Sequence, residues 1–254
     1  MGVVNITPDS FSDGGRFLGA QEAVDHARRL ADEGADIIDI GGESTRPGAT
    51  PVSEEEELRR VLPVLDQLLH LCVSVDTRRT AVMSAALKAG ASMINDVDAL
   101  AAPGALEAVA ATKCGVCLMH KKGEPATMQR EPHYDNVVRE VKAYLEQRVN
   151  AAMAAGIEAA RIAVDPGFGF GKTAQHNLTL LKNLRELSEL PILAGLSRKS
   201  TLGKITGRPV DERLAGSLAM ALLALQSGAT ILRVHDVKET RDVIAIWEAY
   251  KNES

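Results

Sequence analysis

The chain has 254 residues, of which 45% are hydrophobic, 25% are charged and only 3% are aromatic. This length suffices for one large hydrophobic core, so we expect a single domain over residues 1–254. The 29 Lys and Arg and the 34 Asp and Glu give a formal net charge of −5. The chain therefore has no global basic field for nucleic acid or an anionic membrane, and any anion must be bound locally.

Three cysteines lie inside or beside apolar runs, at Cys72, Cys114 and Cys117. An odd number of cysteines argues against a disulfide framework and for a reducing compartment. The first residues contain no basic segment leading into an apolar one, and no run reaches the roughly 18 apolar residues of a membrane span. We expect a cytoplasmic protein without a membrane partner.

Short apolar, β-branched runs recur along the chain, at residues 3–6, 37–40, 72–76, 93–96, 116–119, 162–165, 192–195 and 231–234. The stretches between them carry apolar residues at helical spacing, as at Ala23, Ala27 and Leu30. The strands lack polar alternation, which is typical of parallel strands covered on both faces. Eight units of about 32 residues each predict an α/β fold, a (β/α)8 TIM barrel. A doubly wound open sheet is the alternative, since a strand count does not establish closure.

Residues 211–228 are apolar almost all round, whereas a helix with one solvated face should show an apolar stripe. We expect this helix to form a subunit interface and the protein to be a homodimer. The alternative is a helix buried between its neighbours within one barrel.

Polar residues end the predicted strands, where the chemistry of such barrels lies. Asp76, Asn95 and Asp165 form an acid and amide group. A buried acid needs a partner, and a planar ligand with a guanidine-like N–H edge would supply one. The alternative is that internal Arg residues or backbone N–H groups satisfy these acids.

A second group of strand-end residues is cationic and consists of Arg46, Lys199, Arg233 and His235. A guanidinium matches phosphate oxygens in a bidentate manner, so we expect a phosphate or pyrophosphate ligand here. The alternative for any one of them is a solvated surface charge.

Three further motifs are rejected. The run 167–173, GFGFGKT, has Pro166 where a nucleotide phosphate loop requires Gly. Cys114 and Cys117 have C-x-x-C spacing but enter a strand, so we expect structural burial. Lys199 is flanked by polar residues, which argues against a Schiff-base lysine.

Seven motifs occur in order: NITPDSFSDGG (5–15), GGESTRPGA (41–49), SVDTRR (74–79), IND (94–96), DPGFGFGK (165–172), GLSRKS (195–200) and RVHDV (233–237). Together they resemble the dihydropteroate synthase family, over essentially the whole chain. The resemblance implies a TIM-barrel transferase of folate biosynthesis and a sulfonamide target. It would join p-aminobenzoate to 7,8-dihydropterin-6-ylmethyl diphosphate and release pyrophosphate with the help of Mg²⁺.

The resemblance also assigns site residues. The pterin pocket falls on Asp76, Asn95, Met119, Asp165, Gly195 and Lys199. The diphosphate falls on Asn5, Thr45, Arg46, Arg233 and His235, with Asn5 also at the magnesium ion. The p-aminobenzoate site falls on Phe11, Thr45, Pro47, Phe170, Lys199 and Ser200, with Ser200 expected to begin a helix. The catalytic set is Asp76, Arg46, Lys199, Arg233 and His235.

The resemblance implies a dissociative substitution, in which the cations hold the leaving diphosphate and Asp76 stabilises a cationic pterin methylene. Two other functions remain open. A pterin-dependent methyltransferase would share the pterin pocket without expelling diphosphate, and a catalytically silent paralogue would only bind pterin.

Overall fold

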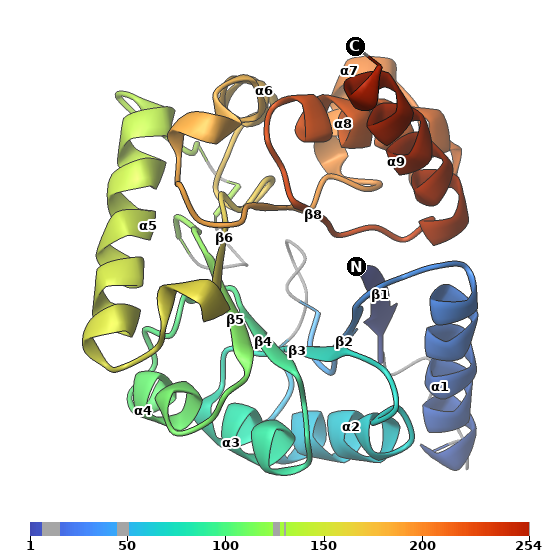
Figure 1. Ribbon diagram of the computed structural model, residues 1–254, viewed down its shortest axis with the longest axis vertical. Helices are drawn as coiled ribbons and strands as arrows, with labels where there is room; N and C mark the ends of the chain where they lie inside the picture. Colours follow the sequence, from blue (N-terminus) through green and yellow to red (C-terminus); the bar gives the residue numbers. More distant parts are fainter. Residues whose placement is uncertain (7–15, 45–50, 124–127, 130, 254) are drawn as a thin grey trace.

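The computed structural model describes residues 1–6, 16–44, 51–123, 128–129 and 131–253. Strands and helices alternate along this part of the chain (Figure 1). The strands are β1 (Gly2–Asn5), β2 (Ile38–Gly41), β3 (Val73–Asp76), β4 (Met93–Asp96), β5 (Gly115–Met119), β6 (Ile162–Asp165), β7 (Leu193–Ala194) and β8 (Ile231–Leu232). The helices are α1 (Arg16–Asp32), α2 (Glu54–Asp66), α3 (Thr80–Lys88), α4 (Ala105–Ala110), α5 (Val137–Ala154), α6 (Ala174–Lys182), α7 (Ser200–Thr206), α8 (Leu214–Gln226) and α9 (Val237–Asn252). Short 3-10 helices are η2 (Ala159–Arg161), η3 (Leu184–Glu186) and η4 (Val210–Glu212).

The strands form a closed parallel barrel. Strands β1 to β6 pair in sequence order, and β7 pairs with β8. Single bridges join the two sheets, between Val164 and Ile192 and between Gly2 and Val234. The Val3 amide donates to the Val234 carbonyl over 3.1 Å, so the last strand returns to the first. The predicted (β/α)8 barrel is confirmed, and the open-sheet alternative is wrong.

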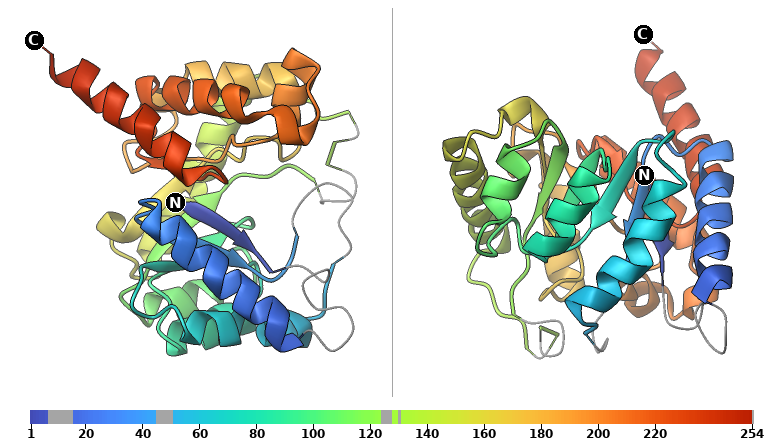
Figure 2. Two further views of the ribbon diagram at one scale, coloured as in Figure 1. Left: turned by 90° about the vertical axis from the view of Figure 1, so that its right-hand side faces the viewer. Right: turned by 90° about the horizontal axis from the view of Figure 1, so that it is seen from below.

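The strand bounds follow the predicted runs closely, and β4 and β6 match them residue for residue. Strands β7 and β8 are two residues long, shorter than predicted. Ile192 and Val234, which lie just outside these two strands, form the single bridges that close the barrel. The helices surround the barrel on its outer side (Figures 1 and 2), and the end of α9 projects beyond the rest of the fold (Figure 2).

The hydrophobic core has two parts. The larger part fills the space between the strands and the helices and includes Leu118 and Val75, both fully buried. The smaller part contains Met93, Cys117 and Leu193. Cys114 and Cys117 are buried free thiols, as expected, and burial raises the pKa of the Cys117 thiol well above its usual value.

The segment predicted to be apolar all round contains η4 and α8. One face of α8 packs inward through Met220, Ala221 and Ala224. On its other face Leu214 and Leu223 are 38% and 46% exposed. The alternative of a helix buried within one barrel is therefore wrong for this face of α8. Among the described helices, none is long and apolar enough to cross a membrane.

We expect Leu118→Ala to lower the free energy of unfolding by about 2–5 kcal/mol, because it removes buried methyl groups and leaves a cavity. Leu178→Ala is the matched control, since Leu178 is 36% exposed on α6. Urea unfolding followed by circular dichroism measures both variants. Equal losses in the two variants would contradict this account of the core.

Candidate active site

A cavity of about 570 Å³ opens at the carboxyl ends of the strands. Several residues predicted from the sequence line it together: Asn5, Asp76, Phe170, Lys199, Ser200, Arg233 and His235. They come from β1, β3 and the segments that follow β6, β7 and β8. Residues far apart in the sequence are thus brought to one end of the barrel, as the strand-end pattern predicts.

The other predicted pterin residues lie next to this lining. Asn95 is the register partner of Asp76 across β3 and β4, and Asp165 is the partner of Met119 across β5 and β6. Asn95, Met119 and Asp165 are 4%, 4% and 5% exposed. Polar side chains at this depth need hydrogen-bond partners, whether from the protein or from a ligand.

An ion-pair network joins Arg233 to two carboxylates. Its Nε donates to Asp39 Oδ2 over 2.6 Å, and its Nη2 donates to Asp76 Oδ2 over 2.8 Å. Burial alone would lower the pKa of the Arg233 guanidinium, but the two carboxylates raise it above its usual value. Burial raises the pKa of the Asp76 carboxyl to about 7, against the opposing effect of Arg233. The acid group and the cation group predicted as separate are therefore directly connected, and an internal Arg does satisfy Asp76.

Asp39 is a site residue that the sequence prediction missed. It is fully buried in β2, and the Oδ2 that accepts from Arg233 also accepts from Asn95 Nδ2 over 3.1 Å. One carboxylate oxygen thus fixes Arg233 and Asn95 relative to each other. A signal was present, because Asp39 is an acid between two isoleucines in the middle of a strand run. Such an acid is stable only with a partner.

Lys199 and Asp165 form a second group of charged residues in the site. The Lys199 ammonium donates to the Phe168 carbonyl and lies 4.9 Å from the centre of the Phe170 ring. Burial lowers the pKa of Lys199 to about 8. Asp165 Oδ1 accepts from the Gly167 amide over 2.6 Å, and burial raises the pKa of the Asp165 carboxyl. The charge of Lys199 opposes this rise in the pKa of Asp165, so a cation acts on the buried acid.

Gly195 and Ser200 have the positions expected of them. A Cβ atom at Gly195 would lie 3.8 Å from both the Lys199 ammonium and the Arg233 side chain, so the glycine leaves room between two cations. Helix α7 begins at Ser200, as predicted. His235 Nδ1 lies 3.0 Å from Ser197 Oγ, which holds the imidazole at the cavity wall.

Four predicted residues, Phe11, Thr45, Arg46 and Pro47, lie outside the described residues. Their assigned roles at the diphosphate and at p-aminobenzoate therefore stay predictions. Within the described residues, no group of three or more His, Cys, Asp or Glu side chains could hold a metal ion.

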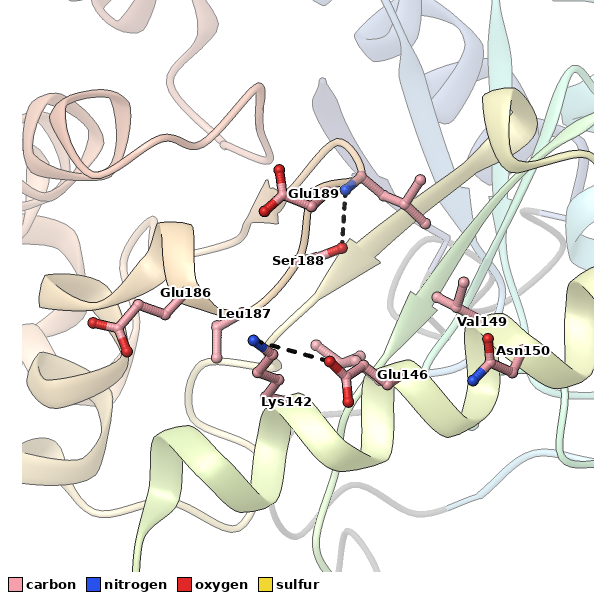
Figure 3. Close-up of a pocket in the computed structure, with 10 residues that line it drawn as sticks. Lys142, Glu146, Val149, Asn150, Glu186, Leu187, Ser188 and Glu189 are labelled. Carbon is pink, nitrogen blue, oxygen red and sulfur yellow. Dashed lines mark hydrogen bonds and ion pairs between the residues drawn. The ribbon is translucent and has the colours of Figure 1, made fainter.

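A second cavity of about 370 Å³ lies between α5 and the segment around η3 (Figure 3). Its polar contacts are local, between Lys142 and Glu146 at 3.9 Å and from the Leu190 amide to Ser188 Oγ at 3.0 Å. Residues 186–190 precede β7, so this cavity lies away from the carboxyl ends of the strands. It contains none of the predicted site residues.

Comparison with known proteins agrees with this geometry. The sequence profile of the family described as "Pterin binding enzyme" matches residues 1–235. The dihydropteroate synthase of Haemophilus influenzae is 49% identical over 257 residues, covering 99% of this chain and 94% of that protein. The chain belongs to the dihydropteroate synthase family.

Solved structures of family members superimpose closely on the fold. The Yersinia pestis dihydropteroate synthase in a sulfonamide drug complex has a TM-score of 0.93 and 47% identity, covering 100% of this chain and 94% of that chain. The Xanthomonas albilineans enzyme in complex with 7,8-dihydropteroate has a TM-score of 0.90 and 51% identity, with 100% and 94% coverage. The family resemblance and the barrel fold predicted from the motifs are confirmed.

We expect Asp39→Ala to lower the free energy of unfolding by about 3 kcal/mol, because it removes one carboxylate from a buried guanidinium. Ser74→Ala is the matched control, since Ser74 is fully buried, is the register partner of Asp39, and its Oγ has no hydrogen-bond partner among the described residues. Its cost should stay below about 1 kcal/mol. Chemical denaturation measures both, and an Asp39→Ala cost no larger than that of Ser74→Ala would refute the network.

Proposed function

We propose that this chain condenses 7,8-dihydropterin-6-ylmethyl diphosphate with p-aminobenzoate to give 7,8-dihydropteroate and pyrophosphate. Family membership over nearly the full chain supports this reaction. The observation that carries it is the ring of acid, amide and cationic groups at one end of the barrel, with Asp76 and Arg233 in direct contact. The ring offers complementary groups to both a pterin edge and a diphosphate.

The pterin lies on the buried acid and amide residues. Asp165 accepts paired N–H bonds from the pterin edge, and Asn95 supplies both a donor and an acceptor. Lys199 donates to a ring acceptor, while Met119 packs against the bicyclic system. The absence of a side chain at Gly195 leaves room for a flat ligand.

The diphosphate is held by cations. Arg233 and His235 line the cavity. The family resemblance adds Thr45 and Arg46, which lie outside the described residues. Asn5 and the oxygens of the diphosphate fit Mg²⁺, because the ion prefers oxygen ligands and commonly binds through substrate phosphates with only one or two protein groups. Asn5 lines the cavity and offers a carboxamide oxygen. When bound, Mg²⁺ would stabilise negative charge on the departing diphosphate.

The reaction breaks the C–O bond between the pterin methylene and the diphosphate, whose oxygen takes the bonding electron pair. Asp76 stabilises the positive charge that develops on the methylene, and Arg46, Lys199, Arg233 and His235 stabilise the leaving group. The arylamine nitrogen then forms the new C–N bond and loses a proton. Phe170, Lys199 and Ser200, with Phe11, Thr45 and Pro47, bind the p-aminobenzoate.

The chain acts as a homodimer through the face that includes α8. Leu214 and Leu223 expose 38% and 46% of their surface there, and the preceding Ile205 exposes 53%. Exposed aliphatic side chains of this kind favour burial against a second copy. The three free cysteines support a cytoplasmic location.

The proposed reaction predicts pyrophosphate release that depends on both substrates, in a coupled assay with Mg²⁺. A methyltransferase would release no pyrophosphate from this pair. A catalytically silent paralogue would bind the pterin diphosphate and leave it intact. Either of these results would overturn the proposed function.

We expect Asp165→Asn to weaken pterin binding at least about tenfold, because charged hydrogen bonds are worth roughly 1.5–3 kcal/mol each. Titration calorimetry with a pterin measures the affinity. Asp36→Asn is the control, because the Asp36 side chain is 77% exposed and lies outside the cavity. If a folded Asp165→Asn variant bound the pterin with wild-type affinity, Asp165 would not be a pterin-binding residue.

The raised pKa of Asp76 predicts an acid limb in the pH profile. Asp76 is negatively charged only above its pKa of about 7, so kcat/KM for the pterin diphosphate should fall as the pH drops below that value. The substrate also titrates in this range, so the residual activity of Asp76→Asn is the control. The contribution of Asp76 to the limb should disappear in that variant, which leaves only the part that the substrate causes, and an unchanged limb would assign it to another group.

The dimer proposal predicts that Leu223→Lys gives a monomer, because it places a charge in an apolar interface. Leu178→Lys is the control at a similarly exposed leucine of α6. Light scattering at micromolar concentration should report a dimer for the wild type and the control. A monomeric wild-type protein would contradict the proposal.

A further inference from the structure

Lys172 is a buried lysine that does not line the active-site cavity. It is 2% exposed, and no ion pair joins it to a carboxylate of the described residues. Its ammonium instead lies 3.0 Å from the Gly167 carbonyl, 3.0 Å from the Phe170 carbonyl and 2.9 Å from His120 Nδ1. The His120 carbonyl is a fourth acceptor at 3.4 Å, so all three N–H donors of the ammonium are satisfied.

His120 is the acceptor in this group and not a second cation. It is 5% exposed and follows β5, with its ring packed edge-on to Tyr144 at 4.9 Å. Burial and the charge of Lys172 lower the pKa of His120 to about 3. The imidazole is therefore neutral, and its Nδ1 lone pair is available to Lys172.

Lys172 links two segments whose backbones are in such close contact that the facing residues have no room for a side chain. Gly167 and Gly171 have positive φ angles of 67° and 64°. A Cβ atom at Gly167 would lie 1.9 Å from the His120 carbonyl oxygen, and one at Gly171 would lie 2.1 Å from the Lys122 carbonyl oxygen. Residues 166–172 thus pack backbone to backbone against the chain that leaves β5.

The segment held in this way carries one wall of the active site. Phe168, Gly169 and Phe170 line the cavity, and the Phe168 carbonyl accepts from the Lys199 ammonium. Lys172 bonds to the carbonyls of Gly167 and Phe170, on either side of Phe168. Movement of these carbonyls would shift the Phe170 ring and Lys199 together.

We propose that Lys172 and His120 form an internal clamp that positions the wall of residues 168–170 for the incoming arylamine. The inference rests on the proposed function, since it assigns this wall to p-aminobenzoate. Both are positioning residues, because neither lines the cavity. Asp165, the carboxylate proposed to bind the pterin, accepts from the Gly167 amide, so loss of the clamp also reaches the pterin site, but the pairing of β6 with β5 fixes its backbone position.

The test compares Lys172→Met with two variants of its partner. His120→Asn keeps an acceptor near the position of Nδ1, whereas His120→Leu removes it. Lys113→Met is the control, because the Lys113 side chain is 89% exposed and its ion pair is with Glu158, outside the clamp. A misplaced binding wall far from the bond-breaking atoms can cost about tenfold or more in rate or binding.

We expect Lys172→Met and His120→Leu to raise the KM for p-aminobenzoate at least about tenfold and the KM for the pterin diphosphate by a smaller factor, because Lys199 and the bond from the Gly167 amide to Asp165 connect this wall to the pterin site. His120→Asn should restore most of the loss, and Lys113→Met should behave as wild type. Equal rises in both KM values, or no rise in folded variants, would overturn the clamp. If Lys172→Met fails to fold, the His120 pair decides the question.

Hydrogen exchange provides a readout that does not depend on activity. The Gly167, Gly169 and Phe170 amides are hydrogen-bonded, and their exchange should accelerate in Lys172→Met and His120→Leu while the α-helices stay protected. Unchanged exchange over residues 166–172 would also overturn the clamp. A wild-type protein that releases no pyrophosphate would overturn the proposed function alone, since the exchange result stands by itself.

Discussion

The contact of Arg233 with Asp39 and Asp76 is the interaction on which the site depends. Its Nε lies 2.6 Å from Asp39 Oδ2, and its Nη2 lies 2.8 Å from Asp76 Oδ2. A barrel interior of this kind is normally apolar, and the smaller core around Met93 and Leu193 follows that rule. At the carboxyl ends of the strands, by contrast, charged side chains are buried, and they are stable there only because they are paired.

The pairing also explains how one end of the barrel can serve two ligands of opposite character. The acids and the amide suit the N–H edge of a pterin, whereas the cations suit a diphosphate. Asp39 holds Arg233 and Asn95 through one oxygen atom, so the two halves of the site keep a fixed spacing. In the proposed reaction, positive charge develops on the pterin methylene beside Asp76, and negative charge develops on the diphosphate beside the cationic side chains.

Much of this arrangement could be predicted from the sequence. Each strand of a parallel barrel is an apolar run, and polar residues at its end mark the active-site face, so Asp76, Asn95 and Asp165 were identified by position. Asp39 was missed because it lies inside a run, where only its charge distinguished it. Lys172 ends the DPGFGFGK motif and also belongs to the failed phosphate-loop motif, but no sequence pattern shows which acceptors surround its ammonium. The pairing of Arg233 with Asp76 depends on which strands meet when the barrel closes, and local sequence does not encode it.

In the proposed reaction, Asp76 and the cationic side chains allow the C–O bond to break before the arylamine attacks. Positional isotope exchange tests it directly, with ¹⁸O placed in the bridge between the pterin methylene and the diphosphate. With Mg²⁺ and without p-aminobenzoate, we expect the label to move from the bridge to the non-bridging oxygens of the same phosphate group. An enzyme that makes 7,8-dihydropteroate but leaves the label in the bridge when p-aminobenzoate is absent would contradict the account.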